Sequence, residues 1–224
     1  MIRRDYPAVC GPAPTWPIIR FCHIGQGKAM TAGVQGGWLV GARRAPSPNC
    51  EPRPEGIQPE LLVIHNISLP PGEFGGGAIE ALFCNCLDWE AHPYYSEIRG
   101  LKVSAHLLIR RDGERVQFVN FDERAWHAGQ SCFEGRENCN DFSIGIELEG
   151  TDDCPYTARQ YDALVATTIA LLAAYPGISL GRIAGHSDIA PGRKSDPGPH
   201  FDWNGFRRQL AAVEQAETDS GRLA

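Results

Sequence analysis

The sequence has no long apolar run, no excess of positive charge and no C-x-x-C pair. No stretch approaches the roughly 18 consecutive apolar residues that a membrane-spanning helix needs, so we expect no membrane contact. The net charge of −6 argues against a general nucleic-acid-binding protein, which normally has a basic face. An anionic small substrate is still compatible with this charge, because a few local cations suffice to bind it.

The eight cysteines lack the paired spacing that is typical of structural zinc sites and redox motifs. Cys84 and Cys86 lie close together in the sequence, but no second pair matches them. A chain of 224 residues can form a core without disulfides, so we predict reduced thiols in a cytoplasmic protein. Four prolines interrupt the apolar part of residues 7–17, and no A-x-A-like cleavage site follows, which argues against an export signal.

Several segments have the patterns of strands. The continuous apolar run "LLVIH" over 61–65 predicts a strand buried on both faces. Residues 106–119 contain two strand-like runs around Asp112-Gly113, which is a strong hairpin signal. Residues 142–150 alternate in character, with three apolar side chains on one face. On the other face, Gly145 is expected to leave open space next to Glu147.

Helical patterns lie between and after these strands. Residues 157–177 predict a helix that begins with a capping box of Thr157 and Gln160 and stops at a Pro-Gly pair. A shorter helix is expected to cover residues 77–89. The mixture predicts one α/β (α+β) domain in which a central sheet is flanked by helices.

The chain divides unevenly by composition. Residues 1–36 are rich in proline, glycine and cysteine without sustained periodicity, and we expect a poorly ordered N-terminal extension or a start codon assigned too far upstream. The folded domain is predicted over residues 37–210, and residues 211–224 are expected to form a C-terminal tail.

Three residues have the chemistry of a catalytic metal site. His65 ends a buried strand, His186 opens a loop rich in proline and glycine, and Asp196 follows ten residues later. Two histidines and one carboxylate suit a catalytic zinc ion, which keeps a fourth position open for water. Lys194 precedes Asp196 by two residues, so both side chains point the same way if the segment is extended. The spacing alone is a weak signal, because many chains contain three such residues.

Each of these residues also has an ordinary structural interpretation. Glu147 could be a solvated charge on a strand, and Lys194 could be an ordinary loop lysine. His65 could be a hydrogen-bonded core histidine, since such histidines outnumber metal ligands. From position alone, the structural interpretation of each residue is the more common one.

Five longer motifs decide between these interpretations. Together they closely resemble the cytoplasmic 1,6-anhydro-N-acetylmuramoyl-L-alanine amidases, the AmpD family, in unbroken order over residues 37–206. The motifs are "VIHNISLPPGEFGG", "HPYYSEIRGLKVSAHLLIRRDGE", "RAWHAG", "NDFSIGIELEGTD" and "GHSDIAPGRKSDPGPHFDW". The resemblance implies a single domain with a central mixed β-sheet flanked by helices, the zinc amidase fold related to peptidoglycan-recognition proteins.

The resemblance also implies the roles of the site residues. It implies one Zn²⁺ per chain held by His65, His186 and Asp196, with Glu147 as general base and Lys194 as the cation that stabilises charge. Such a zinc ion polarises the amide carbonyl and lowers the pKa of bound water from ~15.7 to about 7. The implied reaction is hydrolysis of the amide between the lactyl group of 1,6-anhydro-N-acetylmuramic acid and L-alanine in anhydro-muropeptides, during peptidoglycan recycling.

Contacts to the substrate are a separate expectation. We expect Trp126 and His127 of "RAWHAG" near the sugar or the peptide, with Asn66 on another side, although simple packing explains His127 equally well. Lys102 is a further candidate. In relatives the positions of Lys102 and Asn138 are often arginine, and a lysine lacks the bidentate fork of arginine. This departure bears on how peptide carboxylates are held and leaves the metal site unaffected.

Four functions are compatible with parts of this sequence. The leading hypothesis is the cytoplasmic recycling amidase, acting as a monomer. The alternatives are an exported N-acetylmuramoyl-L-alanine amidase acting on intact peptidoglycan and a non-catalytic muropeptide-binding module. A non-haem iron oxygenase is the fourth, because "HSD" at residues 186–188 mimics its His-x-Asp element; that family needs an all-β barrel, whereas a strong helix precedes the motif here.

Overall fold

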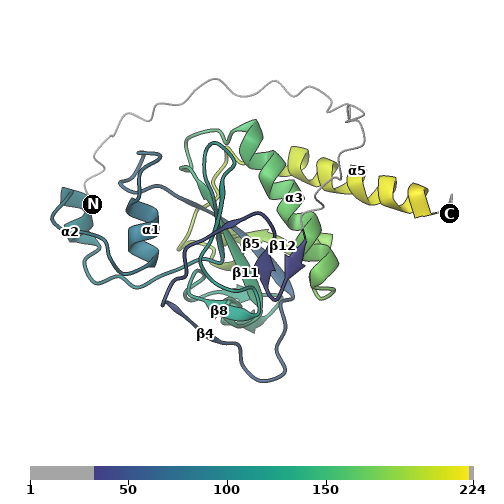
Figure 1. Ribbon diagram of the computed structural model, residues 1–224, viewed down its shortest axis with the longest axis horizontal. Coiled ribbons are helices and arrows are strands. Elements are labelled where there is room, and N and C mark those ends of the chain that lie inside the picture. The colour runs from purple at the N-terminus through teal and green to yellow at the C-terminus, as the bar shows by residue number, and fades with distance from the viewer. Residues whose placement is uncertain (1–32, 222–224) are drawn as a thin grey trace.

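A mixed six-stranded sheet forms the centre of the molecule (Figure 1). The computed structural model describes residues 33–221, so nearly all of the predicted N-terminal extension lies outside the described residues. The strand order is β12-β5-β11-β6-β7-β3, in which only the β6–β7 pair is antiparallel. The strands of this sheet are β3 (Arg43–Arg44), β5 (Leu61–Ile67), β6 (Leu107–Ile109), β7 (Arg115–Gln117), β11 (Ser143–Glu149) and β12 (Ile183–Gly185).

Strands β5 and β11 are the long central pair. They run parallel over seven residue pairs, and every residue of β11 is buried. The apolar run of β5 is explained by its position between β11 and β12, with packed layers on both faces. In this register His65 lies opposite Glu147.

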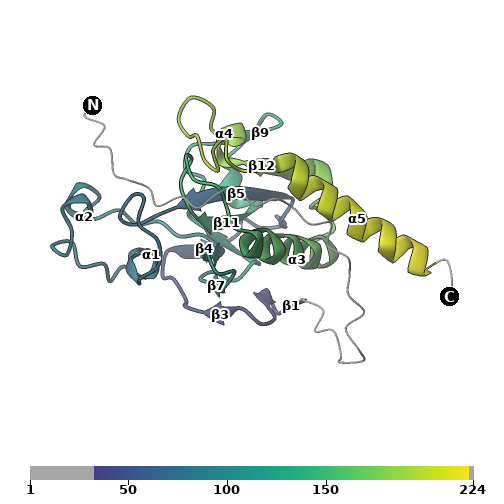
Figure 2. The same cartoon turned by 90° about the horizontal axis from the view of Figure 1, so that it is seen from above.

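Two long helices cover one face of the sheet. Helix α3 (Ala158–Ala174) and helix α5 (Trp203–Gly221) lie side by side in Figures 1 and 2. Alternate strand residues face them and form the main core: Leu62, Ile64, Leu107, Ile109, Ile144, Ile146 and Leu148, which pack with Leu164 and Leu171 of α3 and Phe206 of α5. The other alternate residues, including His65 and Glu147, therefore face away from α3 and α5.

Shorter elements surround the opposite face. Helices α1 (Ala78–Phe83) and α2 (Pro93–Glu97) lie at the end of the molecule remote from α5 (Figure 2). Nearer β12, η1 (Cys139–Asp141) and α4 (His186–Ile189) contribute to a second packed layer. The remaining elements are β1 (Val34–Gln35), β2 (Trp38–Leu39), β4 (Cys50–Pro52), β8 (Glu123–Ala125), β9 (Cys132–Phe133), β10 (Arg136–Glu137) and η2 (Leu180–Arg182).

The structure confirms the predicted strands, hairpin and long helix. Both bonds of the capping box between Thr157 and Gln160 are present. The helix expected to cover 77–89 was predicted too long: it ends at Phe83, because Asn85 adopts a left-handed conformation with φ of 58°. Helix α5 continues past residue 210, where a tail was expected to begin.

Two further features concern the cysteines and the helices. Within the described residues, Cys50, Cys84, Cys86, Cys132 and Cys139 are free thiols, whereas Cys10 and Cys22 lie outside that part of the chain. Among the described helices, none combines the length and apolar character needed to cross a bilayer.

Candidate metal centre and active site

The three predicted metal ligands meet at one point on the face of the sheet opposite α3 and α5. His65 comes from β5, His186 begins α4 directly after β12, and Asp196 lies in the following loop. The Nδ1 atoms of the two histidines are 2.9 Å apart. Asp196 Oδ2 lies 3.2 Å from His65 Nδ1 and 3.0 Å from His186 Nδ1. These three atoms form a group that could hold a metal ion.

The donor set fits a tetrahedral ion with one open position. Bonds of about 2.0–2.2 Å at tetrahedral angles separate ligand atoms by about 3.3–3.6 Å, which is within a few tenths of an ångström of the spacing here. His65 and His186 are buried, with exposed fractions of 1% and 3%. Burial is the main cause that lowers the pKa of His65 to about 4, so this imidazole is neutral, as a metal ligand must be.

The outward nitrogens of both histidines are also engaged. His65 Nε2 lies 2.9 Å from His127 Nδ1, and His186 Nε2 lies 3.1 Å from the carbonyl oxygen of Ala128. Burial, foremost, lowers the pKa of His127 well below its ordinary value, so this ring is neutral too. The Nδ1 atoms of both candidate ligands are thereby left to face the centre.

Asp196 is held as a carboxylate. Burial acts to raise its pKa, but hydrogen bonding to His186 and His65 outweighs burial and leaves the pKa below its ordinary value. Its backbone is fixed as well, since the amide of Ser187 donates to the Asp196 carbonyl at 2.9 Å. Asp188 of α4 fixes the start of this helix, because its Oδ2 accepts the amide hydrogen of Gly185 at 2.7 Å.

Glu147 is the free carboxyl group of the site. Its exposed fraction is 9%, and among the described atoms its Oε2 has no hydrogen-bond partner. Burial raises its pKa well above the ordinary value, the charge of Asp196 raises it further, and Lys194 lowers it. A buried carboxyl group with an unused oxygen beside a metal site can exchange a proton with a reacting group.

Lys194 is exposed, and its backbone amide donates to the carbonyl of Ala190 at 3.1 Å. Its charge lowers the pKa of both Glu147 and His65.

The predicted substrate contacts lie in different settings. The Asn66 side-chain amide donates to Asp152 Oδ1 at 2.8 Å and to the Pro197 carbonyl at 3.2 Å, so it ties two loops together. Trp126 is partly exposed, and its Nε1 donates to Glu51 at 3.2 Å. Lys102 is exposed.

Sequence reasoning missed what fills the space beside Glu147. Gly145 was expected to leave that space open, but a Cβ at Gly145 would lie 2.5 Å from the His127 ring. His127 thus occupies the position that the glycine vacates. Sequence reasoning also missed the contact between the Ala128 carbonyl and His186, because a main-chain acceptor has no signature in the sequence.

Comparison with known proteins identifies the family to which the chain belongs. A family model described as N-acetylmuramoyl-L-alanine amidase matches residues 55–199. The chain belongs to the N-acetylmuramoyl-L-alanine amidase family. This match lies inside the predicted domain of residues 37–210, whose outer boundaries remain predictions.

Close relatives of this amidase cover most of its length. It is 63% identical over 174 residues to 1,6-anhydro-N-acetylmuramyl-L-alanine amidase AmpD of Escherichia coli (strain K12), covering 78% of this chain and 94% of the relative. It is 60% identical over 184 residues to AmpD of Enterobacter cloacae, covering 82% and 98%. A crystal structure of a selenomethionine AmpD derivative matches with a TM-score of 0.77 and 60% identity, covering 79% of this chain and 98% of that one. These findings confirm the family resemblance and the fold class.

Proposed function

We propose that this amidase hydrolyses the amide between the lactyl group of 1,6-anhydro-N-acetylmuramic acid and L-alanine in anhydro-muropeptides, in peptidoglycan recycling. The observation that carries the proposal is the convergence of His65, His186 and Asp196 beside Glu147, a buried carboxyl group with an unused oxygen. The substrate class is supported by the names of relatives that this chain matches over nearly their whole length.

The metal in this proposal is one Zn²⁺ per chain, held by His65 Nδ1, His186 Nδ1 and an Asp196 carboxylate oxygen. When bound, zinc polarises the amide carbonyl and lowers the pKa of a water molecule towards about 7. Two imidazoles and one carboxylate leave an open coordination position, which suits catalysis, whereas a structural zinc site is closed.

Glu147 is the general base and then the general acid. Its carboxylate takes a proton from the attacking water and passes that proton to the departing nitrogen of L-alanine. Because burial already favours the protonated form, the carboxyl group holds this proton readily between the two steps. A group in this role contributes typically 10²- to 10⁴-fold to the rate.

Lys194 supplies the positive charge. Its ammonium group balances the negative charge that develops on the carbonyl oxygen as the amide is attacked. Asn66, Lys102 and Trp126 are proposed to contact the substrate at the edges of the site. His127, which the sequence analysis grouped with them, has both ring nitrogens within hydrogen-bonding distance of protein groups and is considered separately below.

We further propose that the amidase acts as a cytoplasmic monomer. Free thiols favour a reducing compartment, and the structure has them at Cys50, Cys84, Cys86, Cys132 and Cys139. One chain supplies all three residues of the candidate metal site. Size-exclusion chromatography with light scattering measures the oligomeric state directly.

The test is hydrolysis of a defined anhydro-muropeptide, followed by mass spectrometry of the released peptide. The wild-type protein should cleave it, chelation should abolish cleavage, and added zinc should restore it. Glu147→Ala should lose at least about 10²-fold in kcat while still binding zinc. Failure of the zinc-loaded wild type to release the peptide would overturn the proposal.

The same assay separates the alternatives. Faster cleavage of whole sacculi than of the purified anhydro-muropeptide would favour an enzyme of the intact wall. Stoichiometric zinc and muropeptide binding without turnover would favour a non-catalytic module.

A further inference from the structure

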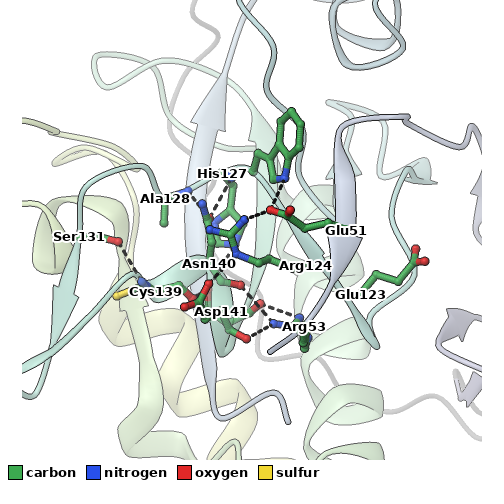
Figure 3. A network of polar contacts seen from close by, with 12 residues as sticks. Glu51, Arg53, Glu123, Arg124, His127, Ala128, Ser131, Cys139, Asn140 and Asp141 are labelled. Atoms are coloured by element: carbon green, nitrogen blue, oxygen red, sulfur yellow. Dashed lines mark hydrogen bonds and ion pairs between the residues drawn. The ribbon is translucent and has the colours of Figure 1, made fainter. Parts of the chain in front are cut away.

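His127 and Ala128 lie directly behind both candidate histidine ligands. The His127 ring contacts His65, and the Ala128 carbonyl contacts His186, so two consecutive residues serve the two ligands. The side-chain oxygen of Asn140 accepts both backbone amides of this pair, at 3.1 Å from His127 N and 2.8 Å from Ala128 N (Figure 3). A single side chain therefore holds the pair in place.

The hydrogen bonds behind His127 assign its tautomer. Ser143 Oγ donates its only proton to the carbonyl of Cys139, 2.5 Å away. The same Oγ lies 3.2 Å from His127 Nε2 and must accept there, so His127 Nε2 carries the hydrogen. A neutral imidazole has one N–H, which leaves a lone pair on His127 Nδ1.

That lone pair in turn assigns the tautomer of His65. His127 Nδ1 can only accept, so His65 Nε2 is the donor across the 2.9 Å between them. His65 Nδ1 then has no hydrogen and presents its lone pair to the metal position. The hydrogen bonds therefore all run in one direction. His65 Nε2 donates to His127 Nδ1, His127 Nε2 donates to Ser143 Oγ, and Ser143 Oγ donates to the Cys139 carbonyl.

His186 is assigned in the same way by its carbonyl partner. The Ala128 oxygen accepts from Arg193 Nη2 at 2.6 Å and lies 3.1 Å from His186 Nε2. A carbonyl oxygen only accepts, so His186 Nε2 carries the hydrogen and Nδ1 faces the centre. Both histidines thus present the same nitrogen.

The packing around His127 leaves its ring little freedom. Any side chain at Gly145 would overlap the ring, because even a Cβ would lie 2.5 Å from it. The ring also makes edge contacts with His65 and His106, at centroid distances of 5.0 and 5.6 Å. Gly145 on β11 thus leaves the space in which the ring lies with its Nδ1 directed at His65.

We propose that His127 is a positioning residue of the metal site: its Nδ1 accepts the Nε2–H of His65 and so keeps the Nδ1 of His65 free for the metal, with Asn140 and Gly145 holding His127 in place. This inference rests on the proposed function, because it assumes that His65 binds the metal. Loss of an outer partner of this kind typically weakens metal affinity 10- to 100-fold.

The experiment measures the zinc Kd of the full chain by competition with a chelator. His127→Leu removes the acceptor and retains an apolar side chain, and we expect its Kd to rise about 10- to 100-fold. His127→Asn places an amide oxygen near the position of Nδ1, and its Kd should stay within about threefold of the wild type. His106→Leu is the matched control: His106 accepts the Gly145 amide at 3.0 Å and lies 3.0 Å from the Glu123 carbonyl, and contacts neither histidine ligand through its nitrogens.

A wild-type Kd in folded His127→Leu would overturn the inference while leaving the amidase proposal intact. Equal losses in His127→Leu and His127→Asn, or in His106→Leu, would also overturn it, because they would indicate packing alone. Absence of zinc binding in the wild type would overturn both proposals.

A second measurement needs no variant. Long-range ¹H–¹⁵N spectra of the imidazoles in the wild type should show His65 and His127 protonated on Nε2. A proton on Nδ1 of His127 would overturn the inference even if His127→Leu does not fold.

Discussion

Strand β11 carries two buried carboxyl groups two residues apart, in opposite circumstances. Glu149 accepts the amide hydrogens of Gly75 at 2.6 Å and Arg111 at 3.0 Å, and it pairs with Arg110 at 3.5 Å. Glu147, on the same face of the strand, has an oxygen with no hydrogen-bond partner among the described atoms. Glu149 therefore ties the loop before α1 and the β6–β7 hairpin to the sheet. Glu147 instead keeps a carboxyl group available for chemistry.

The contrast teaches that burial alone does not identify a functional carboxylate. Both side chains are almost inaccessible, with exposed fractions of 9% for Glu147 and 1% for Glu149. What differs is the supply of donors, because satisfied buried groups are usual and an unsatisfied one needs a reason. The proposed proton transfer is that reason for Glu147.

The largest effect is expected from removing the charge at Glu147. Glu147→Gln should lower kcat on anhydro-muropeptide by about 10²- to 10⁴-fold, because an amide cannot take the proton from water. Steady-state kinetics of the zinc-loaded protein measure it. Glu149→Gln is the matched control and should retain kcat per folded molecule within about tenfold; comparable losses in the two variants would contradict the division of roles.

The same two variants should affect stability in the opposite order to their effects on kcat. Glu149→Gln places an amide NH₂ against backbone donors and should lower the free energy of unfolding by about 1–3 kcal/mol. Glu147→Gln breaks no hydrogen bond to the Oε2 atom, so it should leave the free energy of unfolding unchanged or raise it. Urea denaturation monitored by circular dichroism compares the two, and a larger loss in Glu147→Gln would refute the distinction.

The pH dependence of stability sharpens the same comparison in metal-free protein. The raised pKa of Glu147 means that, above its ordinary value of 4.5, the folded state holds a proton that the unfolded chain releases. The contribution of Glu147 to the free energy of unfolding is therefore fully present below pH 4.5. It falls as the pH rises towards the folded-state pKa. Relative to Glu147→Gln, the wild type should lose stability over this interval; parallel curves from pH 4 to 8 would count against it.

The smallest effect is expected at the loop that Glu149 holds. Gly75 has φ of +81°, and a Cβ there would meet nothing within 4 Å, so Gly75→Ala should cost about 1 kcal/mol through backbone strain alone. Gly77→Ala is the control, because its φ of −105° suits any residue and its surroundings are equally open. Thermal unfolding should separate the two variants, and equal melting temperatures would argue against strain at Gly75.

Much of this arrangement could be predicted from the sequence, and the failures have physical causes. The apolar run of β5 and the capping box of α3 are local patterns, so their elements appeared where expected. The convergence of His65, His186 and Asp196 was inferred from a family resemblance, since spacing cannot show that β12 lies beside β5. The His127 ring beside Gly145 could not be predicted, because it depends on how a loop packs onto β11.

The ligand pairings also carry a kinetic consequence. His65 is 121 residues from His186 and 131 from Asp196, so no short piece of the unfolded chain offers a three-point chelate. Closing such long loops is the slow part of folding a sheet of this topology. If the proposed zinc site is correct, tight zinc binding requires β12 to be paired with β5. The time course of metal uptake during refolding would therefore report when that pairing forms.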